Sequence, residues 1–459
     1  MRLCVRSRIG NLTAESDLIA RVHQVLPEVR RDLEDLVRIQ SVWADPSRRD
    51  DVHRSADTVA ALLRDAGFAR VEVVSEGGAP AVIAHHPAPP GAPTVLLYAH
   101  HDVQPEGDAA QWDSPPFEPT ERGGRLYGRG TADDKAGIAT HLAAFRAHDG
   151  QPPVGVTVFV EGEEESGSPS LRRLLAAHKS RLAADVIVIA DSDNWTAQVP
   201  ALTVSLRGLA DCVVEVATLD HGLHSGLWGG VVPDALTVLV RLLATLHDDE
   251  GNVAVAGLHE GSAAPVDRGA DWVRTESGLL DGVSEIGSGT VAQRLWAKPA
   301  ITVIAIDTTP IAKASNTLIP RAGAKVSLRI APGGDAAAHL EALRRHLEQH
   351  APWGAHVTVT PGDVGQPYAI DAGGPVYDAA RAAFRQAWGV DAVDMGMGGS
   401  IPFIAEFAAA FPNATILVTG VEDPGTQAHS VNESLDLGVL ERAAVTEALL
   451  LAKLGATGG

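Results

Sequence analysis

The chain has 459 residues, of which 45% are hydrophobic and 21% are charged, as is typical of a soluble globular protein with more than one domain. Asp and Glu total 58 against 37 for Lys and Arg, so the formal net charge is −21. Nucleic acids and anionic membranes bind cationic patches, and this acidic balance argues against both partners. Only Cys4 and Cys212 carry thiols, which excludes a disulfide framework or a cysteine-rich zinc site and suits a reducing cytoplasm. No apolar run has the length of a signal peptide core or a transmembrane helix.

The first two hundred residues alternate between helical and strand-like patterns. Apolar residues three or four positions apart predict helices, and short apolar runs with polar flanks predict buried strands. Such alternation indicates a mostly parallel sheet that is covered by helices on both faces. The predicted helices are 15–39, 51–66, 134–147 and 168–178, and the predicted strands are 70–74, 81–85, 94–99, 154–160 and 185–190.

The pattern changes after Arg207-Gly208. The next segments have the order β-α-β-β-α-β of a ferredoxin-like α+β unit, at 211–217, 233–246, 300–306, 325–330, 335–349 and 355–360. A polar, glycine-rich insertion at 248–298 interrupts this unit. The α/β pattern then resumes with a helix at 377–388, a strand at 414–418 and a closing helix at 440–454. The sequence therefore predicts an α/β domain of residues 1–206 and 374–459, interrupted by a second domain of residues 207–373.

Three predicted strands of the α/β domain end in histidines or carboxylates. The strand at 94–99 leads into His100, His101 and Asp102, the strand at 154–160 leads into Glu163-Glu164-Glu165, and the strand at 185–190 leads into Asp191 and Asp193. Ligands of open α/β sheets bind at the carboxyl ends of the strands. Like charges this close repel one another, and a bound cation would relieve that repulsion.

Two further motifs have a simpler explanation when each is taken alone. Asp133 and Asp134 open a predicted helix, where Asp commonly acts as an N-cap, although the glycines around them would also allow Asp133 to face two metal ions. His429 lies in a loop, where a single histidine is usually a surface residue. Taken together, the motifs offer imidazole and carboxylate groups without a thiol, a combination that suits Zn²⁺, Mn²⁺ or Co²⁺. A carboxylate that bridges two metal ions is the usual hydrolytic arrangement.

In this order the motifs resemble the co-catalytic metallopeptidase family of carnosinase, aminoacylase, acetylornithine deacetylase and succinyl-diaminopimelate desuccinylase. The greatest similarity is to its cytosolic nonspecific dipeptidase (carnosinase-like) branch. The resemblance covers nearly the whole chain and rests on AHHDVQP, YGRGTADDKAG, EGEEESGS, SDN, LHSG with WGG, GGSIP and AHSVNE.

The resemblance implies two divalent metal ions per subunit, with Zn²⁺ as the first choice and Mn²⁺ or Co²⁺ as alternatives. It implies that His100 and Asp193 bind one ion, that Glu165 and His429 bind the other, and that Asp133 bridges them. Further implied features are Asp102 as the residue that orients His100, Glu164 as the general base, and a cis peptide bond between Asp133 and Asp134.

Four of these assignments depend on the register of a motif. His101 is an alternative to His100, and Glu164 is chosen within the glutamate run because Ser166-Gly167 comes after it. The choice of Asp193 over Asp191 rests on the Asn194 that comes next. In the interrupting domain, the His-Ser-Gly pattern selects His224 over His221.

The resemblance gives the interrupting domain the roles of lid and dimerisation domain. His224 would reach across a homodimer to stabilise the oxyanion, and Arg329 would bind a substrate carboxylate. Asn316, Thr317, Gly399 and Ser400 are the further substrate contacts that it implies.

The resulting hypothesis is a cytoplasmic, two-metal, broad-specificity dipeptidase that forms a homodimer and has neither nucleic acid nor membrane as a partner. One alternative is an N-acyl-amino-acid amidohydrolase of the same family, which would share the metals and the base. A second is a catalytically inactive metal-binding relative. The sequence offers no function for the insertion at 248–298 beyond decoration of a pocket or an interface.

Overall fold

The computed structural model describes residues 2–262, 266–399 and 402–457, and it divides into two compact units. The first unit consists of Met1–Val204, Asp371–Met395 and Glu406–Gly459, and the second of Ser205–Ile370 and Gly396–Ala405. None of the helices in the described part of the chain is long and apolar enough to cross a membrane.

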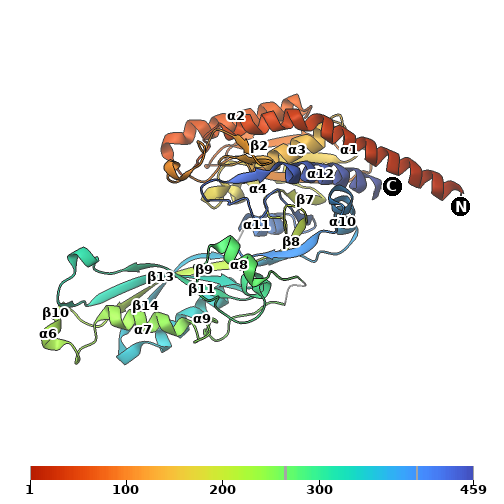
Figure 1. Cartoon of the computed structure of the whole chain (residues 1–459). Helices are drawn as coiled ribbons and strands as arrows, with labels where there is room; N and C mark the ends of the chain where they lie inside the picture. The colour runs from red at the N-terminus through yellow and green to blue at the C-terminus, as the bar shows by residue number, and fades with distance from the viewer. Residues whose placement is uncertain (1, 263–265, 400–401, 458–459) are drawn as a thin grey trace. The chain divides into compact units, whose positions relative to one another are not determined.

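The first unit is built on a six-stranded sheet with the order β1-β2-β6-β3-β7-β17 (Figure 1). The neighbours β6, β3, β7 and β17 run parallel, and β2 and β1 extend the sheet in antiparallel pairs. The mostly parallel sheet that the sequence predicts is therefore confirmed. The strands are β1 (Arg70–Val74), β2 (Ala81–His86), β3 (Thr94–His100), β6 (Gly155–Glu161), β7 (Val186–Ile189) and β17 (Thr415–Val418).

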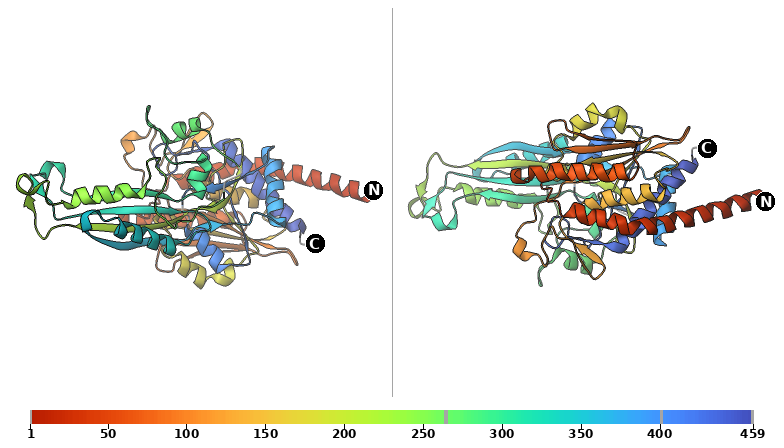
Figure 2. Two further views of the ribbon diagram at one scale, coloured as in Figure 1. Left: turned by 90° about the horizontal axis from the view of Figure 1, so that it is seen from below. Right: turned by 90° about the horizontal axis from the view of Figure 1, so that it is seen from above.

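Helices cover this sheet because its central strands are apolar on both faces, with every residue of β6 and β7 buried. Helices α1, α2, α3 and α12 lie side by side on one face (Figures 1 and 2). On the other face, Phe407 of α11 packs its ring 5.3 Å from the ring of Tyr98 on β3. The helices are α1 (Arg2–Val37), α2 (Arg49–Asp65), α3 (Lys135–Ala147), α4 (Leu171–Ala177), α5 (Lys179–Leu182), α10 (Pro375–Trp388), α11 (Pro402–Ala410) and α12 (Leu437–Thr457).

The second unit has a four-stranded antiparallel sheet with the order β11-β13-β9-β14. Together with α7 and α9, these strands have the β-α-β-β-α-β order that the sequence predicts for a ferredoxin-like unit. Both helices pack on the sheet and enclose an aliphatic core that includes Val214, Leu239, Leu328 and Leu343. The elements are β9 (Gly208–Ala217), α7 (Ala235–Leu243), β11 (Ala300–Asp307), β13 (Arg321–Ile330), α9 (Ala336–Gln349) and β14 (His356–Gly365).

Several short elements have no predicted counterpart, because two to eight residues carry too little periodicity to stand out. Two of them, β8 and β16, carry the chain from one unit into the other. The short elements are β4 (Thr120–Arg122), β5 (Arg125–Tyr127), β8 (Ala201–Leu206), β10 (Leu223–His224), α6 (Ser225–Trp228), α8 (Ala270–Ser277), β12 (Thr317–Leu318), β15 (Tyr368–Ala369), β16 (Val393–Met397) and β18 (Ser434–Asp436).

Candidate metal centre and active site

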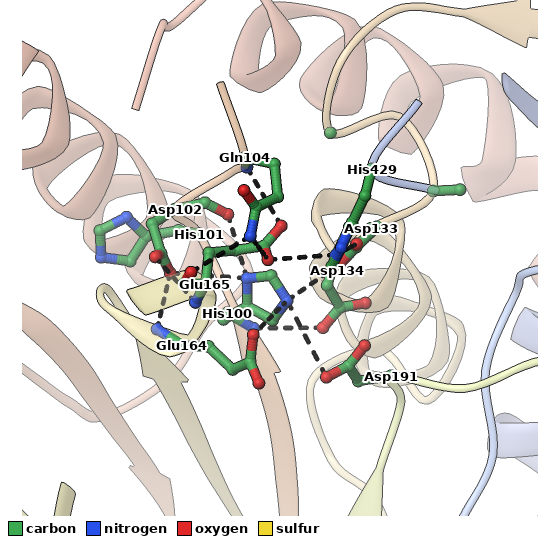
Figure 3. A network of polar contacts seen from close by, with 12 residues as sticks. His100, His101, Asp102, Gln104, Asp133, Asp134, Glu164, Glu165, Asp191 and His429 are labelled. Atoms are coloured by element: carbon green, nitrogen blue, oxygen red, sulfur yellow. Dashed lines mark hydrogen bonds and ion pairs between the residues drawn. The ribbon is translucent and has the colours of Figure 1, made fainter. Parts of the chain in front are cut away.

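The candidate site lies at the carboxyl ends of β3, β6 and β7 in the first unit. The strand register pairs Tyr98 with Ile189 and His100 with Glu161. His100 and Asp191 each lie two residues past the Tyr98–Ile189 pair of β3 and β7, and they therefore reach the same level of the sheet. Figure 3 shows how side chains from these strand ends and from two loops converge on one point.

Two groups of candidate metal ligands meet there, and they share Asp133. One group is His100, Asp133 and Asp191, and the other is Asp133, Glu165 and His429. Within each group, the ligand atoms lie within 4.8 Å of one another. Oδ1 of Asp133 is 3.1 Å from Nε2 of His100, and Oδ2 is 2.9 Å from Nε2 of His429. Asp133 therefore presents one oxygen to each group, as a bridging carboxylate does.

Charge is concentrated in this site. Burial raises the pKa of Asp191 to about 7 and holds the pKa of Glu164 well above its ordinary value. Hydrogen bonds to Asp133 and Glu165 raise the pKa of His429 to about 10. Burial opposes ionisation of Asp133, but its bonds to His100 and His429 outweigh burial and lower its pKa. The carboxylates thus depend on nearby positive charge.

The donor set fits divalent cations. Each group supplies one imidazole nitrogen and two carboxylates, and no thiol takes part. Such mixed donors suit Zn²⁺, Mn²⁺ or Co²⁺ better than Ca²⁺, which takes oxygen ligands only.

The three consecutive glutamates have three different environments. Glu163 belongs to neither ligand group and accepts hydrogen bonds from the backbone N–H groups of Ala79 and Ser170. Glu165 lies 3.2 Å from Nε2 of His429 and accepts a 2.8 Å bond from the Gln104 amide. The Glu164 carboxylate accepts no hydrogen bond from any residue that the structure describes, and its Oε2 lies 3.9 Å from Nε2 of His100. Glu165 is thus fixed, and Glu164 keeps a free carboxylate.

The adjacent histidines also differ. His100 points into the cluster, whereas the His101 ring turns away from it (Figure 3) and bonds the Pro80 carbonyl at 2.8 Å. Burial lowers the pKa of His101 to about 4, so this ring is neutral. The structure therefore places His100, and not His101, among the candidate ligands.

Asp102 supports both sides of the site. Nδ1 of His100 lies 3.0 Å from the Asp102 backbone carbonyl and 3.5 Å from its carboxylate. The same carboxylate accepts hydrogen bonds from the backbone N–H groups of Glu164 and Glu165, at 3.1 and 3.2 Å. Asp102 thus orients the His100 ring and also holds the turn that carries both glutamates.

Residues 96–453 match the model of peptidase family M20/M25/M40, a span that includes all of these candidate ligands. The chain belongs to this family. Its Asp133–Asp134 peptide bond is cis, as the family resemblance implies.

Two relatives and one solved structure match over most of their own length. The chain is 34% identical to the cysteinylglycine-S-conjugate dipeptidase of Corynebacterium striatum over 434 residues, which cover 93% of this chain and 95% of the relative. It is 29% identical to the Beta-Ala-His dipeptidase of Homo sapiens, over 87% and 84% of the two chains. The crystal structure of human carnosine dipeptidase 1 superposes with a TM-score of 0.79 at 25% identity and covers 96% of this chain and 99% of its own.

The structure corrects one residue of the predicted set, because Asp191 and not Asp193 lies in the cluster. Oδ2 of Asp191 is 3.9 Å from Nε2 of His100. Asp193 lies two residues further along and forms an isolated parallel bridge with Glu422. The prediction relied on the neighbouring Asn194, whereas the position of each residue past the end of β7 decides which carboxylate faces His100.

The other predicted residues belong to the second unit. The pairing of β10 with β12 sets His224 directly opposite Thr317, and the Asn316 carbonyl accepts a hydrogen bond from the backbone N–H of Ser225. His224 and Thr317 are exposed, and so is Asn316, which precedes β12. Arg329 lies on β13 and Gly399 lies just after β16, while Ser400 lies outside the described residues.

The sequence did not indicate two buried residues that connect the ligand loops. Glu433 accepts hydrogen bonds from the backbone N–H groups of Gly130, Ala132 and Asp133 at 3.0–3.2 Å, and from the Arg129 guanidinium at 2.6 Å. Arg129 also donates to the Ser430 carbonyl. This pair joins the loop that carries Asp133 to the loop that carries His429. A signal was present in AHSVNE, where Glu433 lies four positions after His429.

The Asp191 assignment gives the first prediction. Asp191→Asn removes one charged ligand beside His100, so we expect bound metal to fall from about two ions per chain toward one. Asp193→Asn is the matched control and should keep both ions. Elemental analysis of protein dialysed against limiting metal measures the difference. Metal loss in the Asp193 variant alone would restore the original assignment.

The Glu433 network gives the second prediction. Glu433→Gln places an amide N–H₂ group against backbone donors, so we expect about 10–100-fold weaker metal binding. Glu447→Gln is the control, because Glu447 forms another buried pair, 2.9 Å from His141, that contacts no ligand loop. Competition with a chelator measures the affinity. Equal weakening in both variants would show that Glu433 contributes general stability only.

Proposed function

We propose that the protein is a cytoplasmic dipeptidase of broad specificity that uses two divalent metal ions to hydrolyse the peptide bond of dipeptides. The observation that carries this proposal is the pair of ligand groups that share Asp133, with the free carboxylate of Glu164 beside them. Relatives that match nearly the full length of the chain are named as dipeptidases for cysteinylglycine conjugates and for Beta-Ala-His. Cys212 is a buried free thiol, which agrees with a reducing compartment.

Each ligand group would hold one ion, with Asp133 in common. When bound, two such ions lower the pKa of a shared water and polarise the scissile carbonyl. Glu164 would take the proton from that water and then deliver it to the nitrogen of the leaving amine, so that it returns to its starting state. Burial raises the pKa of Glu164, and this strengthens it as a base. Zn²⁺ is our first choice, and Mn²⁺ and Co²⁺ suit the same donors.

The second unit would act as lid and dimerisation domain. Arg329 would bind the carboxylate of the substrate, and its planar guanidinium suits a two-point contact. Asn316, Thr317, Gly399 and Ser400 would contribute further contacts. His224 would donate a hydrogen bond to the oxyanion in the active site of a partner subunit.

An N-acyl-amino-acid amidohydrolase is the second candidate within this family, since the same metals and base would hydrolyse an acyl amide. The names of the relatives favour the dipeptidase. The substrates of the two candidates differ in the acyl half of the scissile bond, which carries a free ammonium in a dipeptide and none in an acetylated amino acid.

The test is hydrolysis by protein that has been stripped with a chelator and reloaded with Zn²⁺ or Mn²⁺. We expect metal-dependent cleavage of Ala-Ala, Cys-Gly and Beta-Ala-His, at least about tenfold faster than cleavage of N-acetyl-Ala and N-acetyl-Cys. Amino-acid release measured by chromatography gives the rates. The reverse preference would make the protein an amidohydrolase, and no cleavage of either set by the reloaded protein would contradict a catalytic role.

The homodimer has support in the apolar surface around His224. Leu227 is 78% exposed, Val231 is 81% exposed and Ile311 is 95% exposed, so this end of the second unit presents aliphatic side chains to solvent. Exposed apolar patches commonly mark protein interfaces. A second copy of the chain would cover them.

Mixed dimers test whether His224 acts in the partner's site. Glu164→Gln should bind metal and lose about 10²–10⁴-fold in kcat, because an amide cannot accept the proton. His224→Ala should also be slow. In a mixed dimer, the intact Glu164 of one subunit meets the intact His224 of the other. Random exchange should then restore about one quarter of the wild-type sites. Exchanged subunits that stay as slow as their parents would show that His224 does not act across the dimer.

A further inference from the structure

The second unit contains a pocket of about 750 Å³ that none of the candidate catalytic residues lines. Residues 251–253, 260 and 272–298 supply most of its lining, and the start of β11 closes one side. Pockets that bind small molecules measure about 300–1,000 Å³, so this volume accepts one. The insertion, which has no role in the sequence-based hypothesis, is thus the wall of a cavity.

The walls are mainly apolar. Trp272, Leu279, Val283, Ile286 and Leu295 line the pocket. Val283 is 45% exposed and Ile286 is 67% exposed, and both line the pocket, so a ligand bound there would cover them. Apolar side chains left in contact with water at a concave surface are typical of a binding site for an apolar group.

Most of the charges that line the pocket are already paired. Arg294 is 2.6 Å from Glu285, and Lys298 is 3.9 Å from Glu260. Glu276 is exposed at the end of α8, where water screens it. One charged side chain of the lining remains that is buried and has no partner of opposite charge among the described residues.

That charge is Arg207, whose side chain lines the pocket and is only 8% exposed. Its guanidinium donates to the carbonyls of Gly398, Arg294 and Lys298, at 3.0, 3.3 and 3.5 Å. Within the described ranges, no carboxylate lies within 4 Å of it. Burial and the nearby Arg329 lower the pKa of Arg207 to about 10. A buried guanidinium without a counter-charge is costly, and an anion in the pocket would remove that cost.

We propose that this pocket binds a small molecule with an apolar body and a single carboxylate, and that the carboxylate pairs with Arg207. The apolar walls select the body, and Arg207 selects the charge. The site is separate from the metal centre, because none of the candidate metal ligands lines it.

Octanoate is the probe, and octanol is its uncharged match with the same chain length. We expect octanoate to bind the full-length protein at least about tenfold more tightly than octanol, as measured by titration calorimetry. Chelation of the metals should leave this binding unchanged. Octanoate that was bound to the ions of the metal centre would instead be lost on chelation. Equal affinities for the two probes, or loss of octanoate binding on chelation, would overturn the proposal.

Two variants locate the site. Thr302→Trp places a large ring into the pocket from an exposed position on β11, and it should abolish octanoate binding. Ile306→Trp is the matched control, because Ile306 is exposed on the same strand and does not line the pocket. It should bind octanoate as the parent does. Equal binding by the two tryptophan variants would place octanoate elsewhere and overturn the proposal.

A third variant tests the charge. Arg207→Gln should reduce the preference for octanoate over octanol to about threefold or less, because octanol gains nothing from the guanidinium. Arg207 also holds the Gly398 carbonyl, so this variant is judged on binding and not on turnover. A preserved preference in a folded Arg207 variant would contradict the pairing. If the variant does not fold, the two-probe comparison in Thr302→Trp and Ile306→Trp still decides the proposal.

Discussion

Repulsion among buried carboxylates is the constraint on which this site depends. Asp133, Glu164, Glu165 and Asp191 converge at one edge of the sheet, where each keeps 18% or less of its side chain exposed, and the imidazoles of His100 and His429 oppose their charge. Burial raises the pKa of Asp191 to about 7, which shows how poorly the chain alone supports this charge. Bound cations would supply the positive charge that the two imidazoles do not. A site built this way binds metal because its ligands are held together against their own repulsion.

Hydrogen bonds from backbone N–H groups help to hold the candidate ligands together against this repulsion. The Asp102 carboxylate fixes the turn of Glu164 and Glu165, and Glu433 fixes the loop of Asp133. In both cases a buried acid accepts from main-chain donors next to a candidate ligand. These bonds set the positions of the ligand side chains, and those of Glu433 join segments about 300 residues apart in sequence.

The sheet, the ferredoxin-like order and most of the residues that meet as candidate ligands could be predicted from the sequence, because long apolar periodicities and clustered His and acid residues are local signals. Asp191 could not be chosen over Asp193, since the choice depends on the register of β7 against β3. The role of Glu433 also escaped prediction, because its partners are backbone groups far away in the chain. The short strands β10 and β12 were missed too, and only their pairing sets His224 opposite Thr317.

The glutamate run shows why residue type alone does not define a role. Glu163, Glu164 and Glu165 are chemically identical, yet backbone donors bind the first, and Gln104 and His429 bind the last. The middle one has only a 3.9 Å ion pair with His100 among the described residues. Burial holds the pKa of Glu164 well above its ordinary value, and its carboxylate accepts no hydrogen bond from the described residues. The proposed proton transfer is assigned to Glu164 for this reason, because the carboxylates of Glu163 and Glu165 are held by other donors.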